Sequence, residues 1–265
     1  MYAFRYHRPS NMKDALALGS QNEEGRYLAG GQSLVQAMKL RLTSPSDLID
    51  LNALGDLKTL KSEGGVVTVG AMVRHAEVAA SAAVRNAIPA LAALAGMIGD
   101  RQVRHMGTLG GSLANNDPAA DYPAAVLGLG ATIITNKRKI EADKFFKGLY
   151  ETALEPGELL TAVAFPAPKR AAYMKFKNPA SRFAIVGVFV ADFGKAARVA
   201  VTGAGPSVFR EAQMEKALSA KFAPESVANI KVKADGLNND LHATPEYRAH
   251  LVTVMARRAV EAALG

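Results

Sequence analysis

The chain has 265 residues, 49% of them hydrophobic and 21% charged, which is typical of a folded protein of two or three domains and excludes a disordered chain. Its net charge is +8, but 32 Lys and Arg are mixed with 24 Asp and Glu, so no strongly basic domain stands out. Because the chain has no cysteine, it cannot hold disulfides, thiolate-bound zinc or cysteine-bound iron–sulfur clusters.

The N-terminal residues MYAFRYHRPSN are charged and aromatic and lack the apolar core of a secretory signal. No apolar run approaches the roughly 18 to 20 residues needed to span a bilayer. We therefore expect a cytoplasmic protein without a transmembrane segment. The first unit, residues 1–56, is predicted to contain a helix over residues 11–18 with Asn11 as its cap, a strand over 26–29, a helix over 33–40 and a strand over 47–51.

The second unit, residues 57–168, begins with a predicted hairpin, because Gly64 and Gly65 precede a β-branched run. Residues 83–99 are apolar enough for one buried helix, which tolerates Pro89 only near its first turn or at a kink. The remaining predicted elements are strands over residues 131–135 and 139–142 and a helical segment over residues 144–149.

The densest cluster of basic residues is NKRKIEADK, residues 136–144. It is short, and no aromatic residues alternate with its charges, so it does not favour nucleic-acid binding. We interpret it as a solvated hairpin. A surface for an acidic protein partner is the second interpretation.

Two prolines and a basic pair in AFPAPKRAAY place a domain boundary near residues 166–169. The third unit, residues 169–265, contains three predicted β segments, AAYMKFK, FAIVGVFVADF and ARVAVTGAG. Short loops join them, which indicates an antiparallel sheet. A final helix is predicted to begin with Thr244 as its cap and Pro245 at its first position.

Two segments place a glycine pair beside small polar residues: AGGQS, with Gly30 and Gly31, and LGGSL, with Gly110 and Gly111. Glycine has no Cβ, so it adopts positive φ and lets backbone N–H groups approach a ligand, and successive N–H groups form a concave anion site. A helix beginning near Ser33 would direct its first N–H groups to the same place. Two such loops across a cleft would suit a diphosphate.

The other interpretation is that each glycine pair is a tight turn or a close packing contact, and the residues alone leave both open. Neither loop has the spacing of the G-x-G-x-x-G motif or of a P-loop. Thr108 and Ser112 offer hydroxyl groups beside the second pair. Asp121 offers a carboxylate that either accepts hydrogen bonds from sugar or ribityl hydroxyls or caps a helix over residues 122–129.

The sequence predicts neither a metal site nor a hydrolytic centre in this chain. Its five histidines are dispersed without ligand spacing, and Asp117 and Asp121 have no further ligand near them. No G-x-S-x-G elbow is present. We therefore predict no catalytic side chain and no metal ligand.

Several segments have the order and spacing of one known family: AGGQSLVQAMKLRL, PSDLIDLN, VGAMVRHAE, QVRHMGTLGGSLANNDPAADYPAAVLGLGA and YMKFKNPASRFAIVGV. Together they resemble the FAD-binding medium subunit of molybdenum hydroxylases, a group that includes carbon monoxide dehydrogenase and xanthine dehydrogenase. The C-terminal NDLHATPEYRAHLVTVMARRAV extends the resemblance over nearly the whole chain. It implies an α+β fold in which two small α+β subdomains bind FAD, followed by a C-terminal domain with an antiparallel sheet and helices.

The resemblance also implies which residues contact FAD. The matching positions are Leu28, Ala29, Gly30, Gly31, Gln32, Ser33, Leu34, Gly107, Thr108, Gly110, Gly111, Ser112, Asp121, Leu160 and Lys175. The two glycine loops would hold the diphosphate through backbone N–H groups, and Asp121 would bind flavin hydroxyls. Leu160 and Lys175 would lie near the flavin ring. Lys177 is the alternative to Lys175, because NPASRFA replaces the pattern that some relatives have after the lysine.

In this family a large subunit carries the molybdenum cofactor, a small subunit carries [2Fe-2S] clusters, and the flavin passes electrons to an external acceptor. The resemblance therefore implies an oxidoreductase subunit in a dimer of heterotrimers, cytoplasmic and in contact with a membrane only through the complex. The absence of cysteine fits a chain that holds the flavin alone. A stand-alone FAD-dependent oxidoreductase and a non-catalytic scaffold protein are the two alternatives.

Overall fold

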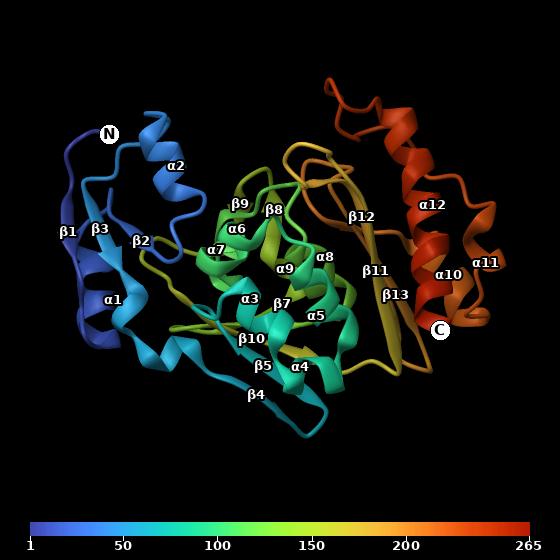
Figure 1. Ribbon diagram of the computed structural model, residues 1–265, viewed down its shortest axis with the longest axis horizontal. Coiled ribbons are helices and arrows are strands. Elements are labelled where there is room, and N and C mark those ends of the chain that lie inside the picture. The colour runs from blue at the N-terminus through green and yellow to red at the C-terminus, as the bar shows by residue number, and fades with distance from the viewer.

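Three main sheets, built by successive parts of the chain, follow one another along the molecule (Figure 1). The computed structural model describes residues 1–265. The two termini lie in the outer units, and the unit between them holds a five-stranded sheet. This arrangement of mixed helices and sheets confirms the α+β class expected from the sequence.

The first unit has a three-stranded parallel sheet in the order β1-β3-β2. Its elements are β1 (Arg5–His7), α1 (Met12–Gln21), β2 (Arg26–Leu28), α2 (Leu34–Lys39) and β3 (Asp47–Asp50). As predicted, Asn11 caps α1, because its side chain accepts the N–H of Asp14 at 2.9 Å. Strand β3 is buried along its whole length, and its Ile49 packs with Ala15 of α1 in a small separate core.

The second unit is built on an antiparallel sheet in the order β4-β5-β10-β6-β7. Two 3-10 turns, Leu51–Ala53 and Gly55–Lys58, lead into it. Its strands are β4 (Leu60–Glu63), β5 (Val66–Gly70), β6 (Thr132–Thr135), β7 (Lys139–Glu141), β8 (Phe146–Gly148), β9 (Glu151–Thr152) and β10 (Leu160–Pro166). Its helices are α3 (His75–Ala80), α4 (Ala82–Ala87), α5 (Pro89–Gly96), α6 (Arg101–Met106), α7 (Leu109–Asn115), α8 (Tyr122–Gly128) and α9 (Ala142–Phe145).

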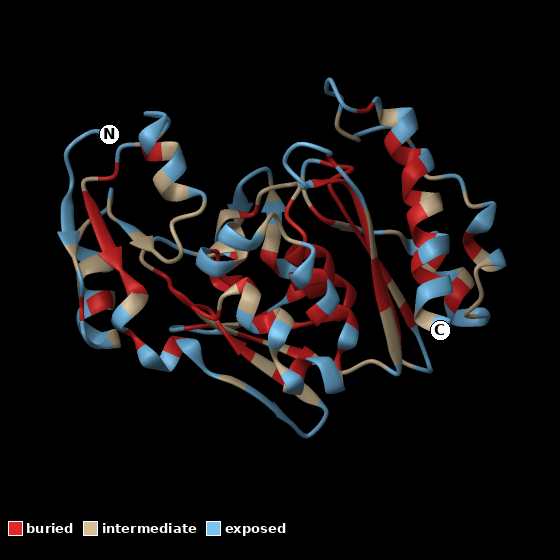
Figure 2. Cartoon of the chain, viewed as in Figure 1, coloured by how far each residue is buried: buried red, intermediate tan, exposed pale blue.

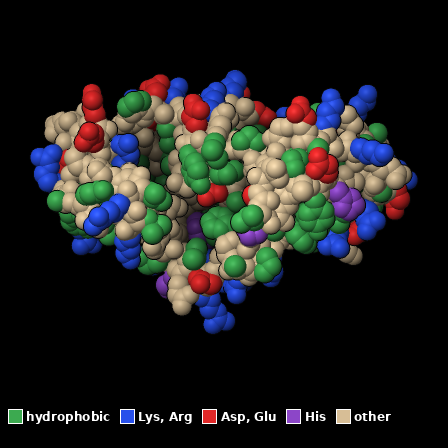
Figure 3. Space-filling view, turned by 90° about the horizontal axis from the view of Figure 1, so that it is seen from above, with side chains coloured by type: hydrophobic (Ala, Val, Ile, Leu, Met, Phe, Trp, Pro, Cys, Tyr) green, Lys and Arg blue, Asp and Glu red, His purple; other side chains and the backbone are tan.

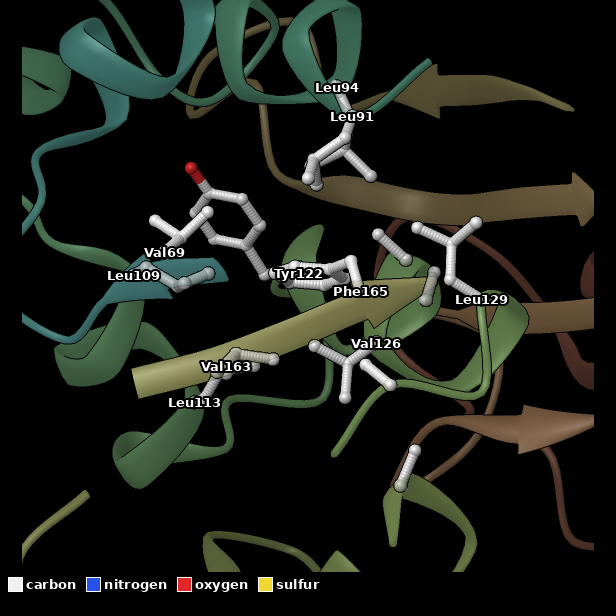
Figure 4. Packing of buried hydrophobic residues seen from close by; sticks show 14 of the residues in the cluster. Val69, Leu91, Leu94, Leu109, Leu113, Tyr122, Val126, Leu129, Val163 and Phe165 are labelled. Carbon is white, nitrogen blue, oxygen red and sulfur yellow. The ribbon is translucent and has the colours of Figure 1, made fainter. Parts of the chain in front are cut away.

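Buried side chains of α5, α7 and α8 meet those of β5 and β10 in the largest core of the molecule (Figure 4). Tyr122 and Phe165 are among its largest fully buried side chains. Helix α8 is buried at every position, which explains the long apolar run in the sequence after Asp121. This core fixes α7, whose first turn contains Gly110 and Gly111, and α8, which begins directly after Asp121.

Two predicted helices of this unit were wrong. Residues 83–99 form two helices, because Pro89 lacks the N–H that would continue α4 and instead begins α5 at its first position. Residues 144–149 do not form a helix: α9 ends at Phe145, and the chain continues as strand β8. The Gly64–Gly65 hairpin and the strands around residues 131–142 are confirmed.

The third unit has an antiparallel sheet in the order β11-β12-β13-β14, as the sequence predicted for its first three strands. Its elements are β11 (Arg170–Lys177), β12 (Ala184–Asp192), β13 (Ala197–Thr202), β14 (Phe209–Arg210), α10 (Ala212–Ala220), α11 (Glu225–Ala228) and α12 (Pro245–Leu264). Thr244 caps α12 by accepting the N–H of Tyr247, and Pro245 is its first residue. Strand β12 is fully buried, because α12 contacts one side of this sheet and α8 of the second unit also contacts it (Figure 2).

The solvated hairpin predicted for residues 136–144 is confirmed in its first part: residues 136–138 form the exposed turn between β6 and β7, whereas residues 142–144 lie in helix α9. Arg138 in this turn donates two hydrogen bonds to Glu158, at 2.9 and 3.0 Å, although the Glu158 side chain has no exposed surface. Thr135 donates a third, at 2.7 Å. None of the helices combines the length and the hydropathy that crossing a bilayer requires.

We predict that the melting temperature of Glu158→Gln decreases less at low pH than that of the wild type. Bonds from Arg138, the Glu155 N–H and Thr135 outweigh burial and lower the pKa of Glu158 to about 2 from 4.5. Its stabilising contribution is therefore complete above pH 4.5 and is lost as the pH falls through about 2. Melting temperatures of the two proteins between pH 2 and pH 7 should converge at the acid end.

The control is Glu63→Gln, which changes an exposed carboxylate paired with Lys61 on β4. Its melting curve should parallel that of the wild type at every pH. Parallel curves for Glu158→Gln as well would contradict the assignment of acid sensitivity to Glu158.

Candidate cofactor-binding site

A cavity of about 480 Å³ lies where the first unit meets the second, and the loop after β11 closes one part of it. The space-filling view shows a hollow between the N-terminal unit and the rest of the molecule (Figure 3). Most of the predicted site residues line this cavity: Ala29, Gly30, Gly31, Gln32, Ser33, Leu34, Gly107, Thr108, Gly111, Ser112 and Asp121. Leu28, Gly110, Leu160 and Lys175 do not line it.

The two glycine loops touch each other. A Cβ added at Gly30 would overlap the carbonyl group of Met106 and lie 3.0 Å from the Cα of Gly107. A Cβ at Gly111 would lie 3.6 Å from that of Ala29. Gly31 has a φ of +73°, which side chains rarely adopt. The two glycine loops therefore both pack closely against each other and line the cavity, two roles that the sequence alone left as alternatives.

The first loop has four consecutive backbone N–H groups, from Gly30 to Ser33, without an acceptor in the protein. Loop residues at the edge of a cavity can leave N–H groups in this state when a ligand or water accepts their hydrogen bonds. All four residues line the cavity. The first loop can therefore bind an anion through its backbone.

The predicted second loop is a helix start: Gly110 and Gly111 lie in the first turn of α7, which Thr108 caps, and the N–H groups of this segment donate within the protein. Those of Leu109 and Gly110 donate to the carbonyls of Val73 and Ala71, at 3.0 and 2.8 Å. The N–H groups of Gly111 and Ser112 both donate to Thr108, to its Oγ1 and to its carbonyl. The expectation that both loops offer backbone donors thus holds for the first loop only. The second loop supplies the surface on which the first loop packs, together with the Thr108 and Ser112 hydroxyl groups.

Asp121 does not cap α8, which corrects one of the two interpretations made from the sequence. Its backbone is helical and its side chain accepts no N–H from the helix. Instead its carboxylate accepts hydrogen bonds from Tyr173 at 2.5 Å and from Lys175 at 3.1 Å. Burial raises the pKa of Asp121, and these two donors from β11 act against that rise.

Lys175 has no donor left for a ligand. Its ammonium group bonds Asp121, the carbonyl of Met97 at 3.0 Å and the carbonyl of Arg182 at 2.9 Å, which uses its three N–H groups. Only 2% of its side chain is exposed. The alternative, Lys177, lies near the end of β11 and does not line the cavity either.

Sequence reasoning missed several cavity residues. They are Arg26, Tyr27, His75, Ile98, Gly99, Val103, Ala114, Asn115, Asp117, Ala120, Tyr150, Ser181, Arg182 and Phe183. Burial and the charge of Arg104 lower the pKa of His75 to about 4, so its ring is neutral near pH 7, and its buried Nδ1 has no partner. His75 lies in the segment VRHAE, and Ser181, Arg182 and Phe183 lie in NPASRFA. Both segments belong to the family resemblance, but none of their residues was assigned to the site from the sequence.

A loop with free backbone N–H groups that packs on the start of a glycine-containing helix, beside two hydroxyl groups and a buried carboxylate, is typical of proteins that bind nucleotide cofactors. No group of His, Cys, Asp and Glu side chains has the arrangement of a metal site. Comparison of the sequence with models of known protein families identifies the cofactor class. The FAD binding domain in molybdopterin dehydrogenase matches residues 2–168, and the CO dehydrogenase flavoprotein C-terminal domain matches residues 171–263. The chain belongs to the family of FAD-binding medium subunits of molybdenum hydroxylases.

Individual relatives agree over the full length. The carbon monoxide dehydrogenase medium chain of Afipia carboxidovorans is 35% identical over 98% of this chain and 96% of its own. The nicotine 6-hydroxylase medium subunit of Paenarthrobacter nicotinovorans is also 35% identical, over 97% and 96%. A solved carbon monoxide dehydrogenase from Hydrogenophaga pseudoflava superposes with a TM-score of 0.90 at 34% identity and covers 99% of this chain and 98% of the solved one.

We predict that Lys175→Met destabilises the protein strongly while Lys177→Met does not. Removing the ammonium group leaves Asp121 as a buried charge without its partner, which lowers the free energy of unfolding by about 3 kcal/mol or more. Lys177 makes no ion pair and is exposed, so its change should stay within about 0.5 kcal/mol. Urea denaturation of both variants measures the difference.

The double variant Lys175→Met with Asp121→Asn should recover part of the loss, because the uncompensated charge is removed. Equal stability of the two single lysine variants would show that the Asp121–Lys175 pair does not hold the structure together.

Proposed function

We propose that this chain binds FAD and passes electrons between iron–sulfur clusters on a partner subunit and an external acceptor, as part of a multi-subunit molybdenum hydroxylase. The observation that carries the proposal is the row of four unpaired N–H groups from Gly30 to Ser33 at the cavity. A bound flavin accepts two electrons together or one at a time, which suits it to connect one-electron clusters with a two-electron acceptor.

The residues of the cavity fit FAD in distinct roles. The first loop would hold the diphosphate, because unpaired N–H groups in a concave turn stabilise negative charge. Thr108 and Ser112 would add hydroxyl donors, and Asp121 would accept hydrogen bonds from the ribityl chain. Lys175 would act through Asp121 by fixing the position of its carboxylate. Leu160, which would approach the flavin ring through its backbone, is buried in β10 and does not line the cavity.

The proposed partners are a large subunit with the molybdenum cofactor and a small subunit with [2Fe-2S] clusters, assembled with this chain as a dimer of heterotrimers in the cytoplasm. Two observations support the assignment of these cofactors to separate partner subunits. Relatives are described as medium chains or medium subunits of carbon monoxide dehydrogenase and nicotine 6-hydroxylase. The chain itself lacks the cysteines that iron–sulfur clusters require. Within the chain we propose units 1–56, 57–168 and 169–265, of which the first two bind FAD.

The substrate of the complex is not assigned to this chain. Relatives of similar identity are named for carbon monoxide, nicotine and glyceraldehyde. Such different substrates on similar medium subunits are expected when the substrate pocket belongs to another subunit. A search for the substrate should therefore begin with the large subunit that co-purifies with this chain.

We predict that Gln32→Glu weakens FAD binding and that Gln36→Glu does not. Gln32 lies in the first loop and lines the cavity, so a carboxylate there repels a diphosphate with little change of shape. Gln36 is exposed on α2 and does not line the cavity, although its variant carries the same added charge. Fluorescence titration of the apo-protein should show a dissociation constant raised about tenfold or more for Gln32→Glu, because repulsion of about 1.4 kcal/mol suffices.

Wild-type protein should also gain about 2.7 kcal/mol of unfolding free energy with FAD at 100 times its dissociation constant. A full-length wild type that stays colourless after incubation with FAD, alone and with its co-purifying subunits, would contradict the proposal. Turnover by the isolated chain without molybdenum or iron would instead favour a stand-alone oxidoreductase.

A further inference from the structure

Tyr150 stands at the tip of the β8–β9 hairpin, at the edge of the cavity. Gly148 pairs with Glu151, so Leu149 and Tyr150 form a two-residue turn. Tyr150 lines the cavity, yet 58% of the residue is exposed. Tyr150 therefore borders the cavity without being packed inside the protein.

The backbone of Tyr150 is strained. Its φ is +54°, in the left-handed region where glycine and asparagine are common and a bulky aromatic residue is an outlier. Leu149, its neighbour in the turn, has no positive φ. Such strain persists only where the surrounding structure holds it, and it clusters at ligand sites.

Asn116 holds this hairpin in place. Its side-chain amide donates to the carbonyls of Gly148 and Glu151, both at 2.8 Å. Asn116 itself is 1% exposed and ends α7 with a φ of +45°, so the helix that begins with the second glycine pair fixes the base of the turn. The turn is thus positioned by the same helix that shapes the cavity.

Asp117 holds the side chain of Tyr150. The Tyr150 hydroxyl donates to the Asp117 carboxylate at 3.3 Å, and the other oxygen of that carboxylate accepts the N–H of Ala119 at 2.8 Å. Asp117 also lines the cavity. The turn that carries Tyr150 is therefore held by Asn116, and the Tyr150 hydroxyl is directed by one long hydrogen bond, although the exposed ring gains little from packing within the chain.

We propose that Tyr150 is a cofactor-binding residue whose ring packs against a planar heteroaromatic ring of the bound dinucleotide. The inference rests on the proposed binding of FAD, which has two such rings, the isoalloxazine and the adenine. An aromatic side chain that is positioned before binding loses little entropy when it stacks. This gain in affinity would offset the backbone strain at Tyr150. Nothing in the sequence marks Tyr150, because its φ and its contacts with Asn116 and Asp117 arise only in the fold.

The first test compares Tyr150→Ala with Tyr150→Phe in titrations of the full-length apo-protein with FAD, FMN and ADP. Tyr150→Ala should raise the dissociation constant of FAD about fivefold or more, as expected when one base–aromatic stack is lost. Tyr150→Phe keeps the ring and should stay close to the wild type. A loss with FMN alone assigns the contact to the isoalloxazine, and a loss with ADP alone assigns it to the adenine.

The second test measures the strain without any ligand. Tyr150→Gly should raise the melting temperature of the apo-protein by about 2 °C or more, because glycine adopts positive φ freely. The matched control is Leu149→Gly, the other residue of the turn, which is 59% exposed and does not line the cavity. It should lower the melting temperature and leave FAD binding unchanged.

Equal dissociation constants for wild type and Tyr150→Ala with all three ligands would overturn the inference. A melting temperature that falls for Tyr150→Gly as it does for Leu149→Gly would overturn the argument from strain. Both results differ from failure of the proposed function, in which the wild type itself binds no FAD.

Discussion

The contact between the two glycine loops is the constraint on which the site depends. Gly30 meets the backbone at Met106 and Gly107 so closely that no Cβ fits between them. Gly107 in turn packs on His75, whose Nε2 would lie 2.5 Å from a Cβ at that position. The first unit is therefore seated on the second through backbone atoms, and this leaves the N–H groups of the first loop facing the cavity. A Cβ at Gly30 would therefore require the backbone at Met106 to shift.

A second junction, between the second and third units, fixes the opposite wall. The segment before α8 is bonded to β13, where Thr202 donates to the carbonyls of Pro118 and Ala120 and the Gly203 N–H donates to Pro118. Asp121, directly after it, is held by β11 through Tyr173 and Lys175. Burying the Asp121–Lys175 ion pair has a high desolvation cost, so the pair adds little net stability. Its main effect is to fix the position of the Asp121 carboxylate.

The sequence predicted what depends on local chemistry. Asn11, Thr244 and the Gly64–Gly65 turn behaved as expected, because caps and turns are decided by a few adjacent residues. The two glycine pairs were recognised for the same reason. The sequence allowed Pro89 near the first turn of a helix or at a kink, and the choice between them depends on how α4 and α5 pack against α3.

What could not be predicted depends on partners far away in the chain. The N–H groups of Leu109 and Gly110 are used by the turn after β5, which no pattern within the second loop reveals. Asp121 resembled a helix cap until Lys175, 54 residues later, supplied its counter-charge. Two of the non-glycine residues with positive φ, Asn116 and Tyr150, lie at a helix end and in a hairpin turn that hydrogen bonds hold together.

The distribution of charge around the cavity then orients any ligand that combines an anion with hydroxyl groups. The first loop presents unpaired N–H groups and no carboxylate, whereas Asp117 and Asp121 line the wall that carries Tyr150 and adjoins the third unit. In the proposed binding mode a diphosphate would be stabilised at the first loop and repelled by the acids, and hydroxyl groups would find acceptors beside the acids. The two glycine pairs look alike in sequence, yet only the first leaves its N–H groups free. The cavity therefore has one end suited to bind an anion and another end suited to bind hydroxyl groups.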